Sequence, residues 1–119
     1  MPSDAAPKSK ANRQTEAPEE LRAKYERALK IIEANEWDIT ADEGRWYAIL
    51  SACAYDLGEA GREYAHRLSR FYAGYSAEET DQKFNHVLRA ANTAYSLGTV
   101  VYWLNETARA HDFDEVQIN

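Results

Sequence analysis

A pair of glycines, Gly58 and Gly61, divides two stretches of helical periodicity and constrains the fold more than any other feature of the sequence. Apolar residues recur every three or four positions on both sides of the pair, which is the pattern of a helix with one buried face. Glycine suits the C-cap of the first helix, because a left-handed backbone is not strained there. The break therefore predicts that a helix over 59–72 turns back against the helix before it and forms the centre of the bundle.

Capping signals predict the other helix boundaries. Pro18, with two glutamates after it, favours a helix start. The segments that begin at Thr40 and Ser76 place a hydroxyl residue three positions before a glutamate, as in a capping box. We expect helices over residues 18–35, 40–57 and 59–72, one that follows Ser76 and one that follows Ser96. No alternating run is long enough for a strand, so the expected fold class is all-α, a compact bundle of about five short helices.

The apolar stripe of each expected helix identifies the core. The stripes also contain Cys53. Because it is the single cysteine of the sequence, an internal disulfide is excluded, and we expect a buried thiol that packs as a small apolar residue. In chain order, the stripes are Leu21, Tyr25, Ala28, Leu29 and Ile32; Trp46, Leu50, Cys53, Ala54 and Leu57; Tyr64, Leu68 and Phe71; Phe84, Val87, Leu88 and Ala91; and Leu97, Val100, Val101, Leu104 and Ala108.

The length of 119 residues suits a single domain. Residues 1–17 contain no large aliphatic side chain after Met1, so we expect a disordered lead or a linker. Residues 18–110 are the predicted helical domain, and residues 111–119 are a predicted acidic tail. The N-terminus lacks the apolar core of a signal peptide, and no apolar run is long enough to cross a membrane, so we expect a cytoplasmic location.

The formal net charge of −6 does not favour general attraction to nucleic acid, because Lys and Arg contacts to phosphates supply most of that affinity. A local basic face is still compatible with this total. Arg62, His66 and Arg70 recur every four residues on one side of the expected helix, and Lys83 and Arg45 can join them. These five residues are the candidate nucleic-acid-binding site, with guanidinium groups that contact phosphates.

A second interpretation of this face is that its cations only balance neighbouring acids. Arg62 and Arg70 lie within reach of Glu59, Glu63 and Asp56, with which they can form surface ion pairs. The three tryptophans leave a similar choice: they can stack on bases, but on apolar helix faces they are more often core residues.

Signals for catalysis are sparse. Glu63 and His66 have the Glu-x-x-His spacing of di-iron bundles, but such a site needs two copies of the motif and two further glutamates. No phosphate-binding loop is present. Cys53 lies on an apolar stripe and lacks the sequence context of a nucleophile. We therefore expect no metal, no cofactor and no catalytic residue, and we predict that this chain is not an enzyme.

The spacing of several aromatic, glycine and hydroxyl residues resembles that of a known family, the small helical primase C-terminal domain of the second type. This domain occurs in proteins of phages, plasmids and integrated mobile elements, including those of Bacteroidetes. The resemblance covers roughly Tyr25 to Ala108, and departures from the family pattern fall at Arg67–Ser69, at Phe84 and at Asn92–Tyr95. The residues that carry it are Trp46, Leu57, Gly58, Gly61, His66, Ser69, Tyr75, Ser76, Lys83, Phe84, Leu97, Gly98 and Thr99.

The resemblance implies a role in the replication or mobilisation of a genetic element. It favours a non-catalytic helical accessory domain of a primase/helicase-type protein, with DNA, single-stranded or template, and a primase/helicase module as partners. A different function class remains open, in which the chain is a protein-interaction module that docks a neighbouring domain and has no role with nucleic acid. The sequence leaves the oligomeric state undetermined.

Overall fold

The computed structural model describes residues 18–118, which contain helices, turns and irregular segments but no strand. The all-α fold class is therefore confirmed for this part of the chain. The predicted disordered lead, residues 1–17, lies outside the described residues, as does Asn119. No helix in the described part is long and apolar enough to span a membrane. The elements in chain order are α2 (Pro18–Asn35), α3 (Glu43–Leu57), the 3₁₀ turn η1 (Gly58–Ala60), α4 (Gly61–Ser69), α5 (Ala77–Ala90) and α6 (Leu97–Ala110).

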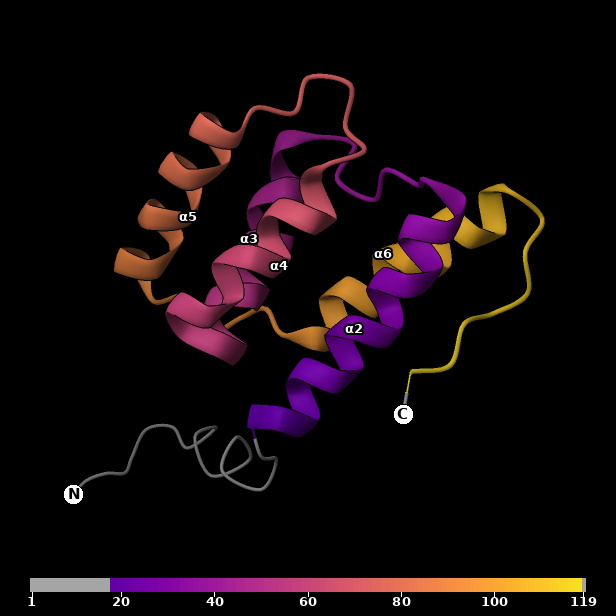
Figure 1. Ribbon diagram of the computed structural model, residues 1–119, viewed down its shortest axis with the longest axis horizontal. Helices are drawn as coiled ribbons and strands as arrows, with labels where there is room; N and C mark the ends of the chain where they lie inside the picture. The colour runs from indigo at the N-terminus through magenta and orange to yellow at the C-terminus, as the bar shows by residue number, and fades with distance from the viewer. Residues whose placement is uncertain (1–17, 119) are drawn as a thin grey trace.

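Helix α3 is the centre of the bundle. It packs against α2, α4, α5 and α6, and in Figure 1 it lies with α4 between orange α5 on one side and α2 and α6 on the other. Six consecutive residues, Ala48 to Cys53, are buried. The prediction that the stretch after Gly58 is the centre was therefore wrong. A single apolar stripe suggested one buried face, but a helix with neighbours on all sides buries small residues on every face.

The junction between α3 and α4 has the backbone that the glycine pair predicted. Gly58 has φ +59° and donates its N–H to the carbonyl of Ala54, so it caps α3. Gly61 lies against α3: a Cβ atom built on it would be 2.3 Å from the carbonyl oxygen of Cys53. That separation is shorter than any van der Waals contact, so only glycine allows α4 to start this close to α3. The return of α4 along α3 is confirmed.

The start of α3 differs from the predicted capping box at Thr40. The N-cap is Asp42, whose Oδ1 accepts the N–H of Arg45 at 2.8 Å, and the helix begins at Glu43. Thr40 is buried, and its backbone N–H and its hydroxyl both donate to Asp38. Aspartate and threonine are both good N-cap residues, and tertiary packing of the loop decided between them. The cap that was predicted at Ser76 is confirmed, because its hydroxyl accepts the N–H of Glu79.

Helix α4 ends earlier than residue 72. Its last helical residue is Ser69, after which Tyr72 donates its N–H to the carbonyl of Ser69, and Tyr75 donates to that of Tyr72. These turns redirect the chain toward α5, and they leave Phe71 only partly buried. The rest of the predicted stripe, Tyr64 and Leu68, is buried against α3 and α2.

Arg67 joins α4 to α2. Its guanidinium donates two hydrogen bonds to Glu26, at 2.7 and 3.2 Å, and two to Glu33, at 2.9 and 3.0 Å. Such forked pairing fixes the orientation of two helices more firmly than a single point contact. The arginine lowers the pKa of both glutamates, chiefly through these hydrogen bonds.

The acidic segment after α6 lies against the domain. Val116 is buried, and the side chain of Asn105 accepts its N–H and donates to its carbonyl oxygen. His111 stacks on Trp37, and Phe113 meets the same indole edge-on. In Figure 1 this segment runs back along the outside of the bundle. The few apolar residues of this segment, among them Phe113 and Val116, stand between acidic ones without a helical stripe, so the sequence predicted only a tail.

The contact at Gly61 predicts a large loss of stability on adding a methyl group. Gly61→Ala should lower the free energy of unfolding by about 3 kcal/mol, because the Cβ overlaps a backbone carbonyl that cannot move aside. Gly98→Ala is the matched control, since a Cβ there meets nothing within 4 Å, and it should raise stability by about 0.5 kcal/mol. Urea denaturation of both variants checks this. Equal stability of the two variants would contradict it.

The Arg67 contacts predict a loss of stability in acid. Because the folded-state pKa values of Glu26 and Glu33 are lowered, their contribution is present above the unfolded pKa of 4.5 and disappears as the pH falls through the folded values. Arg67→Met should therefore lose less stability than the parent protein between about pH 6 and pH 3. Urea midpoints at the two pH values measure the difference. Arg109→Met removes an exposed pair with Glu106 and should behave like the parent.

Candidate functional site

Arg62 forms the densest polar network on the candidate basic face of α4. Its Nε donates to Glu59 at 2.5 Å, Nη1 donates to Asp81 at 3.1 Å, and Nη2 donates to Asn85 at 2.7 Å. Its guanidinium carbon also lies 5.0 Å from the centroid of the Phe84 ring. The hydrogen bonding that Arg62 donates to Glu59 is the largest cause of its raised pKa. The pair with Glu59 is the alternative that the sequence suggested for this residue, and Asp81 was not anticipated.

His66 extends the same network into the α4–α5 connection. Its Nε2 lies 2.8 Å from Asp81 Oδ1, and its Nδ1 lies 2.8 Å from the hydroxyl of Tyr75. Because a carboxylate only accepts, Nε2 carries the proton, and in neutral imidazole Nδ1 then accepts from the Tyr75 hydroxyl. His66 is the first cause, and Arg62 the second, of the lowered pKa of Asp81.

A hydroxyl, an imidazole and a carboxylate in line are also the components of an activated nucleophile. An activated nucleophile also needs donors that stabilise the negative charge formed during a reaction. The nearby N–H donors of Arg62 are already hydrogen-bonded to Glu59, Asp81 and Asn85. The arrangement therefore serves to hold the loop after α4 against α5.

The other three candidate cations lie in different places. Arg70 is exposed at the C-cap of α4. Lys83, on α5, pairs with Glu43 at 2.6 Å and lies 5.4 Å from the Trp46 ring centroid. Arg45, on α3, lies over the ring of Trp103 on α6. The structure brings Arg62 and His66 together at Asp81, and it records no hydrogen bond or ion pair from Arg45 to either of them within residues 18–118.

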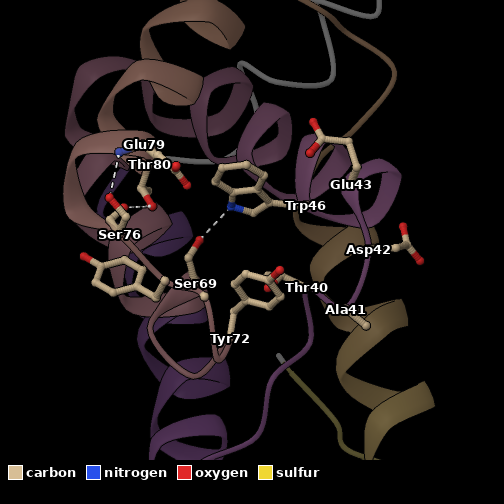
Figure 2. Close-up of a pocket in the computed structure, with 12 residues that line it drawn as sticks. Thr40, Ala41, Asp42, Glu43, Trp46, Ser69, Tyr72, Ser76, Glu79 and Thr80 are labelled. Atoms are coloured by element: carbon tan, nitrogen blue, oxygen red, sulfur yellow. Dashed lines mark hydrogen bonds between the residues drawn. The ribbon is translucent and has the colours of Figure 1, made fainter.

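A cavity of about 190 Å³ opens between the first turn of α3, the loop after α4 and the first turn of α5. Figure 2 shows the Trp46 indole in its wall, with Nε1 donating to the hydroxyl of Ser69 at 3.0 Å and the Tyr72 ring beside it. The ionisable groups that line it are three acids, Asp42, Glu43 and Glu79, with tyrosine hydroxyls. This lining does not suit a phosphate, because the acids would repel it.

Two further sequence candidates have clear positions. Cys53 is fully buried, and burial raises the pKa of its thiol far above the usual range, so it packs as the predicted small apolar residue. Glu63 is exposed, whereas the two ring nitrogens of His66 are hydrogen-bonded to Tyr75 and Asp81. Within residues 18–118, no three His, Cys, Asp or Glu side chains gather in a way that could hold a metal ion.

The partners of His66 could not have been found from the sequence. Tyr75 and Asp81 follow it by 9 and 15 residues, and neither spacing belongs to a helical or capping pattern. Only the turns after Ser69 bring the tyrosine back toward α4. The position of Arg45 over the Trp103 ring could not be predicted either, because it depends on how α3 and α6 pack.

Comparison with protein families gives one match. Residues 25–103 match the family described as Primase C terminal 2 (PriCT-2), which confirms the family suggested by the sequence motifs. No curated protein and no solved structure matches the chain. The matched range begins inside α2 and ends inside α6, so it contains α3, α4 and α5 entirely.

The hydroxyl of Tyr75 predicts a measurable role in ordering the α4–α5 connection. Tyr75→Phe removes the hydrogen bond to His66 and should cost about 1 kcal/mol of stability. Amide hydrogen exchange should become faster at residues 70–76, which this contact holds, while α2 is unchanged. Tyr102→Phe, at an exposed position on α6, is the control for the loss of a phenol hydroxyl. Exchange at 70–76 that stays at the parent rate would contradict this role.

Proposed function

Because the chain belongs to the Primase C terminal 2 family, we propose that it is a non-catalytic helical accessory domain of a mobile-element primase/helicase-type replication protein that contacts DNA. The family match over residues 25–103 carries this proposal. It supports a primase-associated domain directly, and the accessory role and the DNA contact are our extension of it.

The chemistry of the described residues supports an accessory role. The one aligned hydroxyl, imidazole and carboxylate set, Tyr75, His66 and Asp81, spans a loop and a helix that it holds in place. The Cys53 thiol is buried, and its raised pKa keeps it protonated. A thiol in this state is a poor nucleophile.

The distribution of cations limits the kind of DNA contact. Arg62, Arg67 and Lys83 each form ion pairs within the domain, so their charge is partly balanced before any ligand arrives. Arg70 and Arg45 have no such pair among the residues described. Few of these cations are then available to phosphates, and we expect affinity in the weak, non-specific range, with Kd on the order of 10 µM.

A docking module for a neighbouring domain is the second candidate. The observation that favours it is the exposure of three large aromatic residues, Tyr72, Tyr102 and Phe113. Exposed tyrosine and phenylalanine are typical of protein interfaces, as well as of sites that stack bases. In this case a primase or helicase module would bind the chain, and DNA would not.

Salt dependence tests the DNA contact. Binding of the full chain to a fluorescent single-stranded oligonucleotide should weaken about sevenfold between 50 and 200 mM salt if two phosphates are contacted. Fluorescence anisotropy measures this, with the matching duplex as a second ligand.

Two results would contradict the proposal. Absence of binding at low salt would remove the DNA contact, and affinity that does not change with salt would show that phosphates are not contacted. Co-purification of the chain with a primase or helicase module, without DNA binding, would support the docking function instead.

A further inference from the structure

A second hollow lies between the first turns of α3 and α6. It is an open groove of about 560 Å³, a size in the range of small-ligand sites. Unlike the cavity beside Trp46, it contains an arginine and only one acid, Asp42. The residues that define the groove here are Arg45, Tyr95, Gly98, Tyr102 and Trp103.

Arg45 is held in the groove without a carboxylate partner. Its guanidinium carbon lies 4.0 Å from the centroid of the Trp103 ring, which is the geometry of a cation–π contact. Its Nε is buried and has no hydrogen-bond partner among the described residues. Asp42, the one acid that lines the groove, accepts the backbone N–H of Arg45 and so caps α3. The guanidinium is thus oriented by an indole and has no carboxylate partner among the described residues, so its two Nη groups, unlike the buried Nε, remain as donors for a ligand.

The first turn of α6 adds positive potential to the same groove. It contains no acidic residue that would offset the helix dipole, and although Ser96 caps the N–H of Thr99, no partner is recorded for the N–H groups of Leu97 and Gly98 among the described residues. A Cβ at Gly98 would meet nothing within 4 Å, and the residue has no positive φ. The fold therefore does not require glycine here, although glycine weakens a helix. Its absence of a side chain leaves the helix backbone open to close approach.

Aromatic rings complete the groove. Tyr102 is 56% exposed and meets Trp103 at 82°, with ring centroids 4.8 Å apart. The rings of Tyr95 and Tyr47 pack edge to face against one another. The groove thus places flat, partly exposed rings beside one unpaired cation. Stacking of a base on such a ring strengthens the binding of a single strand and requires the base to be unpaired.

We propose that this groove binds one or two nucleotides of single-stranded nucleic acid. A base stacks on Tyr102, and its phosphate accepts hydrogen bonds from Arg45 and from the N–H groups at the start of α6. This inference rests on the proposed function, because it takes nucleic acid as the ligand, and it moves the contact from the α4 face to the α3–α6 groove. A duplex fits poorly, since its bases are stacked on one another and a single arginine neutralises few of its phosphates.

Four variants of the full chain test the groove by anisotropy with roughly 15-nucleotide oligo(dT) and oligo(rU), and with duplex DNA. Tyr102→Ala should weaken single-strand binding about five- to hundredfold, while Tyr102→Phe, which keeps the ring, should stay within about twofold. Arg45→Gln should weaken binding and reduce the salt slope by about 0.7. Arg109→Gln, which removes an exposed cation at the opposite end of α6 from the groove, is the matched control and should change little.

Gly98→Glu provides a test that separates binding from folding. A carboxylate in the first turn of α6 favours the helix dipole, so thermal stability should hold or rise. The same charge repels phosphate, so single-strand affinity should fall at least about fivefold relative to Gly98→Gln. Opposite effects on stability and affinity cannot arise from misfolding.

The results distinguish this inference from the proposed function. If single strands bind with salt dependence but Tyr102→Ala, Arg45→Gln and Gly98→Glu all bind like the parent, the groove is wrong and the DNA contact stands. Tighter binding to duplex that Tyr102→Ala leaves unchanged also overturns the groove. If no nucleic acid binds, the DNA contact fails and the groove fails with it. Equal affinity for oligo(dT) and oligo(rU) supports stacking without selection of the sugar.

Discussion

The close approach of Gly61 to the carbonyl of Cys53 is the constraint on which the rest of the bundle depends. It lets α4 start in van der Waals contact with the middle of α3, after a single 3₁₀ turn. From there Tyr64 and Leu68 reach the core, while Arg67 reaches α2 and His66 reaches α5. Displacing α4 outward by even an ångström would stretch all of these contacts, because protein interiors are close-packed.

Three cations in residues 18–118 join different helices through ion pairs. Arg67 connects α4 to α2, Arg62 connects α4 to α5, and Lys83 connects α5 to α3. A chain with an excess of acids readily pairs its cations in this way. The consequence is that a basic stripe in the sequence does not become a basic surface. Arg45 is different because its neighbour across the interface is an indole and not a carboxylate.

Several features could be predicted because they depend on nearby residues. The α2 stripe from Leu21 to Ile32 is buried as expected, since its spacing follows the helical repeat. Ser76 caps α5 through a hydroxyl and an N–H three residues apart. The cap of α3 was placed at Thr40 instead of Asp42 because two capping residues stand close together, and burial of the threonine decided between them. Helix α4 ends at Ser69 because the chain forms turns there, and no local sequence pattern predicts those turns.

The sequence by itself determined the all-α class, the helix break at the glycine pair and the family, because periodicity, capping and characteristic residues are local properties of the chain. The tertiary structure decided that α3 is the centre, that His66 lies between Tyr75 and Asp81, and which cations are free. These outcomes depend on side chains far apart in the sequence that meet only after the helices pack. Whether Arg45 faces a carboxylate or an indole is a property of the α3–α6 interface, and no spacing along the chain encodes it.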